Sequence, residues 1–540
     1  MCNDRAGENV LRHIENIINK YPLLLIAGLG LLAYINAFSG GFMFDDYAYF
    51  DHKFKNLDVG YQFTLNTGQT KDLEGARAFM WYRPVGNLLL VLEYFLFGQH
   101  TFYYHVFGLI LWIMAAWCVF HLVKRLLNDQ RLALLTATLY SVHPINGIVV
   151  NYITASVYAL QVIVMVACMW IFLDQESPVS LRITTHIVRI PRIALGLMLM
   201  MMALLIHETS LLLPCYLIAL CLLLKRPLKY CWPWVVCAGI YFIWRLCYAS
   251  LTSYTVARID LFHMSIVEYL ATIAKLFTWY ITCLVKASGM VVLHSVEVVR
   301  TEVWQWLGVG SMCVTVMVFL FFKLKSLSAR LGFYFLMIGF LIVPVAALLQ
   351  PINGMMIEPH WFVFSSIGFF LMVAVLIARL GRWQQVAWLT IILLWIFNSW
   401  GMNFLWANEK RYGNYWHQQS PAFISLAFHM GQMYDRAHDY TNMRYYFEIA
   451  LKHHYHPELI YPSLGWMCLQ HGDFKSAERY LIGAVYNNPK DFHMWTNLGV
   501  VFERIGKPID ARNAYTMALR SNPHFLPAQK NMERLKHEGE

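Results

Sequence analysis

Charged residues are scarce in this chain. Only 14% of its 540 residues are Asp, Glu, Lys or Arg, whereas 58% are hydrophobic; soluble globular proteins carry roughly 25% charged residues. The deficit is uneven, because residues 1–410 are dominated by apolar runs while residues 411–540 have the composition of a soluble protein. The sequence therefore excludes a single soluble globular domain and predicts two domains, residues 1–410 and 411–540.

Motifs of metal centres and nucleotide sites are also missing. Most of the eleven Cys lie inside apolar runs, where Cys behaves as a small hydrophobe, and there is no CxxC motif or Cys/His cluster. Residues 411–540 contain only Cys468, so this segment cannot form a disulfide of its own. No Gly-rich phosphate loop is present. We therefore expect neither a zinc site nor a nucleotide site.

A nucleic-acid partner and a cleaved leader are excluded by the arrangement of charge and apolar residues. The net charge is +10, but Lys and Arg form short clusters between apolar runs, the pattern that sets orientation in a membrane. The first apolar run, 22–39, is followed by Gly40-Gly41-Phe42 instead of a small-x-small cleavage site. This run is predicted to be a retained membrane helix.

Long apolar runs are what the chain has in abundance. A membrane-spanning helix needs about 20 mostly apolar residues, and the sequence predicts about eleven such spans. They lie near residues 22–39, 103–123, 132–146, 150–173, 193–207, 210–224, 232–250, 303–322, 332–350, 361–378 and 385–404. The fold class predicted for residues 1–410 is an all-α polytopic membrane helical bundle.

The basic clusters predict the orientation of these spans. With the N-terminus in the cytoplasm, every basic cluster between spans also falls on the cytoplasmic side, as the positive-inside rule requires. Two long loops, 40–102 and 251–302, and the C-terminal segment then lie outside. The clusters are Lys124-Arg125-Arg131, Arg182-Arg189-Arg192, Lys225-Arg226-Lys229, Lys323-Lys325-Arg330 and Arg379-Arg382.

The C-terminal segment repeats with a period of 34 residues. The pattern is that of tetratricopeptide repeats, helix pairs that stack into a solenoid. Three repeats and a polar capping helix, 525–538, are predicted, and such stacks usually bind a peptide or protein on their concave face. A rigid spacer or an oligomerisation module is the alternative. The best-matched repeat contains Trp495, Leu498, Gly499, Phe502, Gly506, Ala511, Tyr515, Ala518 and Pro523.

Five groups of ionisable residues lie near the outer ends of the predicted spans, where such residues mark functional sites by default. The first is the pair Asp45 and Asp46, which directly follows the first span. Two carboxylates can perform acid/base chemistry or hold a divalent cation; an exposed loop pair or a helix N-cap is an equal alternative. The second is Arg83, whose guanidinium suits bidentate contact with phosphate or carboxylate. Its alternative role is an interfacial anchor.

Three further groups follow later spans. His143 lies between the third and fourth spans, where a lone His is more often structural than catalytic. His207 and Glu208 lie between two short apolar runs, where an unpaired charge is costly, so a functional role is favoured. Glu358 and His360 open the tenth span.

The predicted orientation places all five groups on the outer side. This predicts one extracytoplasmic cavity lined with carboxylates, imidazoles and an arginine. Nearby cations would be available to neutralise a phosphate head group, with snorkelling to the membrane interface as the alternative. These cations are Arg245, Arg258, Lys275 and Lys286.

The order and spacing of these motifs resemble the GT-C glycosyltransferases, multi-span enzymes that use polyprenyl-phosphate sugars. The nearest resemblance is to the transmembrane and tetratricopeptide-repeat O-mannosyltransferases. It covers nearly the whole chain and rests on the repeats and five stretches: FDDYAYF (44–50), YRPVGNLLLVLEYFLFG (82–98) with FYYHVFGLILW (102–112), YSVHPINGIVVNYITASVYAL (140–160), HETSLLLP (207–214) and EPHWFVFSSIGF (358–369).

The resemblance implies roles for individual residues. An acidic residue in the first outer loop of such enzymes acts as base or orients the acceptor, which implies this role for Asp45, with Asp46 beside it. Donor-binding or cavity-lining roles are implied for Arg83, His143, Glu208 and Glu358. The chain departs from its relatives at three cationic positions: His207 replaces a common Lys, Thr154-Ala155-Ser156-Val157 replaces a Gly-Arg-Ala-acid stretch, and Pro359-His360 replaces an Arg. Mannose therefore cannot be assumed as the sugar.

The predicted function is inverting transfer of a sugar from a polyprenyl-phosphate donor to a Ser or Thr hydroxyl of an acceptor protein, an EC 2.4 activity. No cofactor is required, and a divalent cation at Asp45 and Asp46 remains open. Two alternatives are transfer to a glycolipid or polysaccharide, and a non-catalytic membrane scaffold that recruits partners through its repeats. A bacterial inner membrane is favoured over the endoplasmic reticulum, with the repeats periplasmic or lumenal.

Overall fold

The computed structural model describes residues 20–44, 46, 69–71, 77–79, 82–174, 185–250, 264–344 and 355–537. Two of the predicted site residues, Asp45 and Arg258, lie outside this part of the chain. The chain divides into two compact units, Met1–Ser420 and Pro421–Glu540.

The division between the units falls after α19 (Glu409–Gln419), whereas the sequence placed it at residue 410. Two aromatic residues of α19 are bound to the backbone of the first unit. The Tyr412 hydroxyl accepts a hydrogen bond from the Val292 N–H at 3.0 Å, and the Trp416 indole donates to the Leu293 carbonyl at 2.6 Å. These bonds attach α19 to the membrane unit although its composition is polar.

The first unit is helical, and six helices among its described residues are long and apolar enough to cross a membrane. The bent pair Gln130–Val142 and Pro144–Asn151 would make a seventh span. The structure is therefore all-α and compatible with a multi-pass membrane protein. The six are Pro22–Ser39, Thr101–Leu127, Ile153–Asp174, Val303–Lys323, Leu327–Pro344 and Gly381–Trp406.

The predicted count of eleven spans is not confirmed. Four apolar helices among the described residues are shorter than a full span: Pro84–Phe97, Arg192–Ile206, Glu208–Leu223 and Ser366–Ala378. Three of these were predicted as spans near 193–207, 210–224 and 361–378. Each is interrupted at one end by an extended or 3₁₀ segment.

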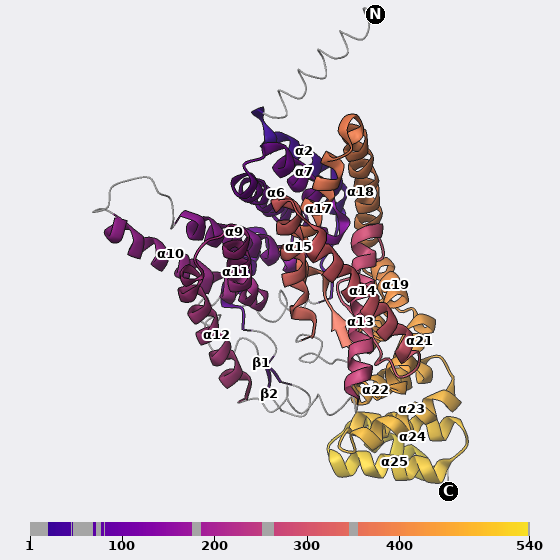
Figure 1. Ribbon diagram of the computed structural model, residues 1–540. Helices are drawn as coiled ribbons and strands as arrows, with labels where there is room; N and C mark the ends of the chain where they lie inside the picture. Colours follow the sequence, from indigo (N-terminus) through magenta and orange to yellow (C-terminus); the bar gives the residue numbers. More distant parts are fainter. Residues whose placement is uncertain are drawn as a thin grey trace, which may run out of the picture. The chain divides into compact units, whose positions relative to one another are not determined.

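The helices and strands of the first unit are shown in Figure 1. Two short antiparallel pairs, β1 with β2 and β3 with β4, are formed among the described residues. The helices are α2 (Pro22–Tyr34), α5 (Pro84–Phe97), α6 (Thr101–Leu127), α7 (Gln130–Val142), α8 (Ile148–Asn151), α9 (Val157–Asp174), α10 (Thr185–Ile206), α11 (Leu213–Leu223), α12 (Trp232–Ser250), α13 (Ile266–Lys286), α14 (Val303–Lys323), α15 (Leu327–Phe340), α17 (Ser366–Ala378) and α18 (Gln384–Trp406); the strands are β1 (Gln69–Lys71), β2 (Arg77–Phe79), β3 (His294–Val296) and β4 (Met355–Ile357).

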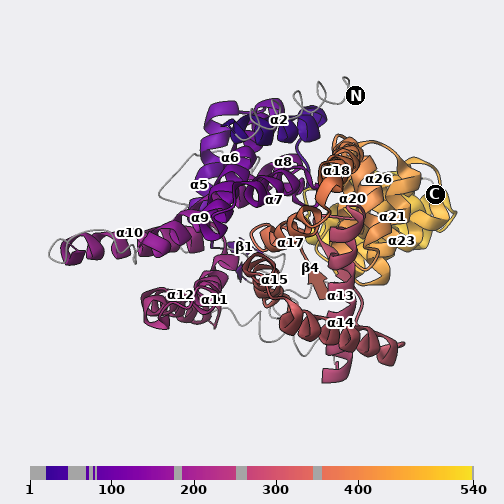
Figure 2. The same ribbon diagram turned by 45° about the horizontal axis from the view of Figure 1, so that its top comes forward.

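Helix α13 lies within the segment that the sequence predicted to be an outer loop. It begins with a capping box, in which the Ser265 hydroxyl accepts from the Glu268 N–H and the Glu268 carboxylate accepts from the Ser265 N–H. Polar residues such as Lys275 interrupt its apolar pattern, so it does not read as a span. It packs against α14, and the two helices cross in Figure 2.

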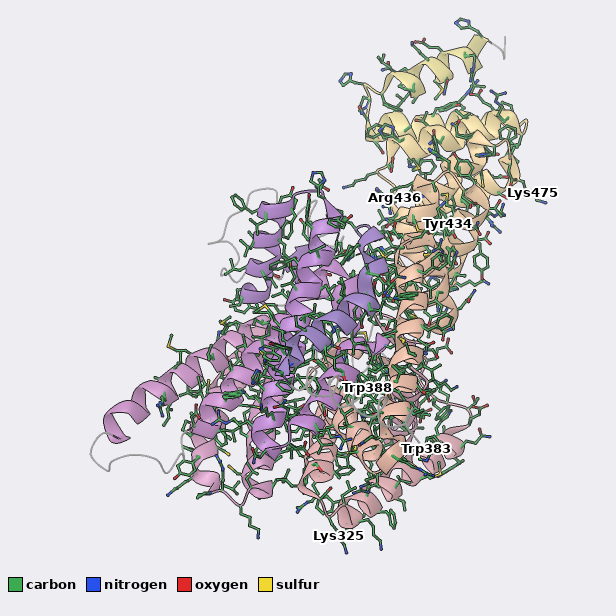
Figure 3. All side chains as sticks on the ribbon, turned by 90° about the horizontal axis from the view of Figure 1, so that it is seen from above. Lys325, Trp383, Trp388, Tyr434, Arg436 and Lys475 are labelled. Carbon is green, nitrogen blue, oxygen red and sulfur yellow. The ribbon has the colours of Figure 1, made fainter. Side chains whose placement is uncertain are left out.

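The interior of the bundle is held by aromatic packing and by hydrogen bonds between helices. Trp112 of α6 and Tyr140 of α7 are fully buried, and their ring centroids lie 4.7 Å apart. Trp388 of α18, labelled in Figure 3, donates its indole N–H to the Thr138 hydroxyl of α7 at 3.1 Å. In an apolar bundle each such bond satisfies a polar group that would otherwise be costly to bury.

The second unit is a stack of helical hairpins. Three hairpins follow one another and a last helix, α26, closes the stack. The helices are α20 (Ile424–Arg436), α21 (Tyr440–Lys452), α22 (Pro457–Gln470), α23 (Phe474–Asn487), α24 (Phe492–Arg504), α25 (Pro508–Ser521) and α26 (Leu526–His537).

A glycine recurs every 34 residues where the two helices of each hairpin meet. A Cβ atom built on Gly431, Gly465 or Gly499 would lie 2.3, 2.6 or 2.4 Å from the side chain that faces it across the hairpin. The facing residues are Phe447, Leu481 and Tyr515, also 34 residues apart. Each of the three hairpins therefore has the same close contact, in which a large side chain of the second helix packs against a glycine of the first.

Gly499→Val is expected to destabilise the second unit. The added side chain would overlap the Tyr515 ring, which is fully buried and cannot move freely. Overpacking of this kind costs about 1–3 kcal/mol, and thermal unfolding of the full chain measures it. Arg512→Val, at an exposed helix position, is the control, with a cost of only a few tenths of a kcal/mol. Equal effects of the two changes would contradict the packing role of Gly499.

Candidate functional site

Three breaks in the apolar helices carry the predicted polar motifs. They are the turn 143–156 between α7 and α9, the segment 207–212 between α10 and α11, and the segment 355–365 before α17. Irregular backbone at membrane depth is tolerated only where it is buried in protein or lines a water-filled cavity. The breaks therefore make this region the candidate site, ahead of any argument from individual side chains.

Arg83, directly before α5, and Glu208, in the segment 207–212, form a bidentate ion pair. Arg83 Nε donates to Glu208 Oε2 at 2.9 Å, and the second guanidinium nitrogen donates to Oε1 at 2.7 Å. The two side chains are 18% and 23% exposed. Arg83 precedes α5, and Gly86 in the first turn of α5 lies against the end of α10, where a Cβ would be 3.1 Å from the Ile206 carbonyl oxygen. The glycine lets Arg83 approach Glu208.

The ion pair keeps Glu208 ionised. Burial acts to raise its pKa, but the Arg83 guanidinium outweighs burial, and Arg245 acts in the same direction. The pKa of Glu208 is therefore below its ordinary value. Arg245, one of the four predicted cations, therefore acts electrostatically on this pair.

His207 presents a buried N–H group that has no hydrogen-bond partner among the described residues. Its Nδ1 accepts from the Thr209 N–H at 3.2 Å and lies 2.9 Å from the Thr209 hydroxyl. The proton of the neutral ring must therefore lie on Nε2. This nitrogen is the one left without a partner, although the side chain is only 1% exposed. Burial, together with Arg83 nearby, keeps the pKa of His207 well below its ordinary value, so the ring is a neutral donor.

Tyr158 joins His207 to the third break. Its ring centroid lies 4.9 Å from that of His207 and 4.4 Å from that of His360. The His360 Nε2 atom is 2.5 Å from Glu358 Oε2, and its Nδ1 has no partner within the described part of the chain. The structure thus brings Arg83, His207, Glu208, Glu358 and His360 into one cluster. Tyr158 was not predicted, because an uncharged aromatic in an apolar run gives no local signal.

Two carboxylates meet at the turn 153–156. Asp46 is buried, and its two oxygens accept from the backbone N–H groups of Met43 at 3.0 Å and Thr154 at 3.1 Å. Glu93 of α5 is buried as well, and it accepts from the Ser156 hydroxyl at 2.9 Å. Asp46 therefore ties the segment after α2 to this turn. Glu93 was not among the predicted site residues; its burial depends on the docking of α5.

Glu93 is expected to weaken the fold as the pH rises. Burial raises its pKa to about 8, and the Asp46 carboxylate adds to the rise, against the opposing hydrogen bond from Ser156. The folded state thus holds a proton that the unfolded chain loses near pH 4.5. The contribution of Glu93 to the free energy of unfolding is therefore largest at low pH, and it is lost as the pH rises toward about 8.

Glu93→Gln removes this titration, so the variant should unfold at a higher temperature than wild type. The gap should widen between about pH 5 and 8 and then level off. Thermal unfolding at a series of pH values measures it. Glu302→Gln, at an exposed position, should follow the wild-type curve, and a constant gap for Glu93→Gln would contradict the buried, protonated carboxyl.

Three other predicted residues, His143, Lys275 and Lys286, have contacts or exposure of a different kind from the residues of the cluster. His143 is fully buried; its Nε2 lies 3.1 Å from the Leu284 carbonyl, and its ring centroid lies 4.4 Å from that of Trp395. Lys275 lies over the Trp306 ring at 5.7 Å, and Lys286 is exposed in the last turn of α13. His143 therefore has the contacts that the structural alternative predicts.

The described residues contain no group of three or more His, Cys, Asp or Glu side chains able to hold a metal ion. A groove of about 530 Å³ lies away from the ion pair, between α18 and the turn 287–289.

A scan against models of known protein families finds no match to the chain, and a search of curated proteins finds no significant match either.

Proposed function

We propose that the chain is an inverting membrane glycosyltransferase of the GT-C type, which transfers a sugar from a polyprenyl-phosphate donor to a Ser or Thr hydroxyl of an acceptor protein. The observation that carries the proposal is the His207 N–H, unpartnered among the described residues, in a buried cluster that also holds the Arg83–Glu208 ion pair. A buried donor without a partner is costly, so a ligand oxygen at this position would satisfy it.

The donor phosphate is assigned to this cluster. Glu208 neutralises much of the Arg83 charge, and Arg245 adds positive potential beside the pair. His207 contributes a neutral hydrogen bond to a phosphate oxygen. As the bond between phosphate and the anomeric carbon breaks, negative charge grows on the phosphate, and preorganised donors of this kind stabilise it. The polyprenyl phosphate leaves as a stable anion, so no general acid is needed.

The acceptor side is assigned to Asp45. The acceptor hydroxyl oxygen forms the new bond to the anomeric carbon from the face opposite the phosphate, and its proton passes to the Asp45 carboxylate. Asp46 is less suited to this role, because both of its oxygens already accept backbone N–H groups. A divalent cation held by Asp45 and Asp46 is left open.

The second unit is proposed to be a tetratricopeptide-repeat solenoid that delivers the acceptor protein. The recurring contacts of Gly431, Gly465 and Gly499 support three equivalent repeats. Binding energy gathered by this unit, away from the chemistry, can be used to orient the acceptor hydroxyl. The proposal places the unit on the outer side of a bilayer crossed about eleven times, in a bacterial inner membrane rather than the endoplasmic reticulum.

Intact-protein mass spectrometry of co-expressed candidate acceptors tests the proposal, with wild type compared with Asp45→Asn at equal expression. A sugar-sized mass increment in wild type alone would support transfer and the need for Asp45. An increment in both would remove Asp45 as the base. No increment on any protein would favour a glycolipid or polysaccharide acceptor, or the non-catalytic scaffold.

A further inference from the structure

Helix α22 in the middle of the second unit is apolar on both of its faces. One face packs inside the stack, where Ile460 and Leu464 are fully buried. On the other face Leu459 is 40% exposed and Trp466 is 47% exposed. Glu458 is the only charged residue in the helix, and it lies 2.9 Å from His456. A helix that is apolar all round is normally buried all round, so its outer face calls for a covering partner.

The exposed apolar stripe is only one helix wide. The 34-residue repeat places Gln432 of α20 and Val500 of α24 at positions equivalent to Trp466. Gln432 is polar, and Val500 is packed against the buried cluster around Tyr515. Ser463 lies between Leu459 and Trp466 in α22, and the equivalent positions of the flanking helices carry His429 and Asn497. Polar side chains therefore border the stripe on both sides.

We propose that this stripe is the docking site for an extended, uncharged segment of the acceptor polypeptide, anchored by a large apolar or aromatic side chain against Trp466. The inference rests on the proposed function and names the feature by which the repeats select acceptors. A single extended chain fits because it can place one side chain on Trp466 while its backbone reaches the polar residues beside the stripe. A bilayer or a second folded copy would need a wider apolar area.

Because α22 has only one charged residue, Glu458, we expect the segment that binds it to be uncharged. A charged segment would lose hydration against Leu459 and Trp466, which is unfavourable, and α22 itself offers it only Glu458, already close to His456. An aromatic side chain gains contact area and ring stacking with Trp466. The expected acceptors therefore carry a large apolar residue in a flexible Ser/Thr-rich segment.

Fluorescence anisotropy on the full chain in detergent tests the site. The probe is a synthetic peptide of Gly, Ser and Thr with one central Trp, and its twin carries Ala at that place. Wild type should bind the Trp peptide at least about tenfold more tightly than the Ala twin, since single aromatic anchors dominate such interfaces. Trp466→Ala should remove this difference, and Trp466→Phe should keep most of it.

Tyr486→Ala is the matched control, because Tyr486 is an aromatic residue on α23 that is 83% exposed. It should bind both peptides as wild type does, and unfolding temperatures should match for all variants. Equal binding of the two peptides by wild type, or equal losses from Trp466→Ala and Tyr486→Ala, would overturn the docking site. Because the readout is binding, a chain that binds the Trp peptide but transfers no sugar would refute the proposed function and leave the site standing.

Discussion

Asp45→Asn is expected to reduce the transfer rate by about 10²–10⁴-fold, the usual contribution of a general base. The amide cannot accept the proton of the acceptor hydroxyl, while its shape hardly differs from that of the carboxylate. Binding of acceptor and donor should change little, so the loss should appear in kcat with KM nearly constant. Steady-state transfer to a fixed acceptor, followed by mass spectrometry, measures both.

Asp46→Asn is the informative companion, because the two acidic residues are neighbours with different expected roles. The amide nitrogen of the introduced side chain would face a backbone N–H of Met43 or Thr154, and a donor cannot bond to a donor. Losing a buried hydrogen bond costs about 1–3 kcal/mol, so this variant should unfold at a lower temperature. Its transfer rate per folded molecule should stay within about tenfold of wild type, well above the rate of the Asp45 variant. The reverse order of rates would move the base to Asp46.

The resemblance favoured Asp45 over Asp46 as the base, but the local sequence gives no physical reason for that preference. An Asp-Asp pair after an apolar run gives both carboxylates the same local context. The proposed difference rests on the hydrogen bond from the Thr154 N–H to Asp46, which joins residues 108 positions apart.

The breaks in the bundle were predictable because Pro and polar residues interrupt apolar runs locally. His143-Pro144 and His207-Glu208 each mark the end of a helix where the sequence indicated one. The direction in which each side chain points was not predictable. His143 is packed against Trp395 inside the bundle, whereas His207 contacts Tyr158 in the cluster. Helix α13 was missed for the related reason that an amphipathic pattern with Lys275 does not resemble a span.

Removal of either partner of the Arg83–Glu208 pair is expected to destabilise the first unit more than removal of both. A single change such as Glu208→Ala leaves a partly buried guanidinium without its counter-ion, which costs about 1–3 kcal/mol at a site that is not fully desolvated. Arg83→Ala likewise leaves the Glu208 carboxylate without its counter-ion. The double variant leaves no unpaired charge, so its loss of stability should be smaller than that of either single variant. Thermal unfolding of the three variants beside wild type measures the coupling.

The pH dependence of the unfolding temperatures of the same variants tests whether the Arg83–Glu208 interaction is electrostatic. Because Arg83 holds the pKa of Glu208 below its ordinary value of 4.5, the stability from the pair is complete above about pH 4.5 and is lost as the pH falls below it. Wild type should therefore approach the stability of Glu208→Ala in acid, because protonated Glu208 no longer neutralises Arg83. A stability gap that does not change with pH would mean that the contact is held by packing and not by charge.

Catalysis should respond differently from stability in this set. Arg83→Ala should lower transfer by about 10²–10³-fold, the effect of losing one preorganised donor at a developing anion, and Arg83→Lys should restore part of the rate because the charge returns without the bidentate geometry. The double variant, although better folded than either single one, should remain as inactive as Arg83→Ala. If restored folding were to restore transfer, the ion pair would be a structural element, and the donor phosphate would have to be bound elsewhere in the chain.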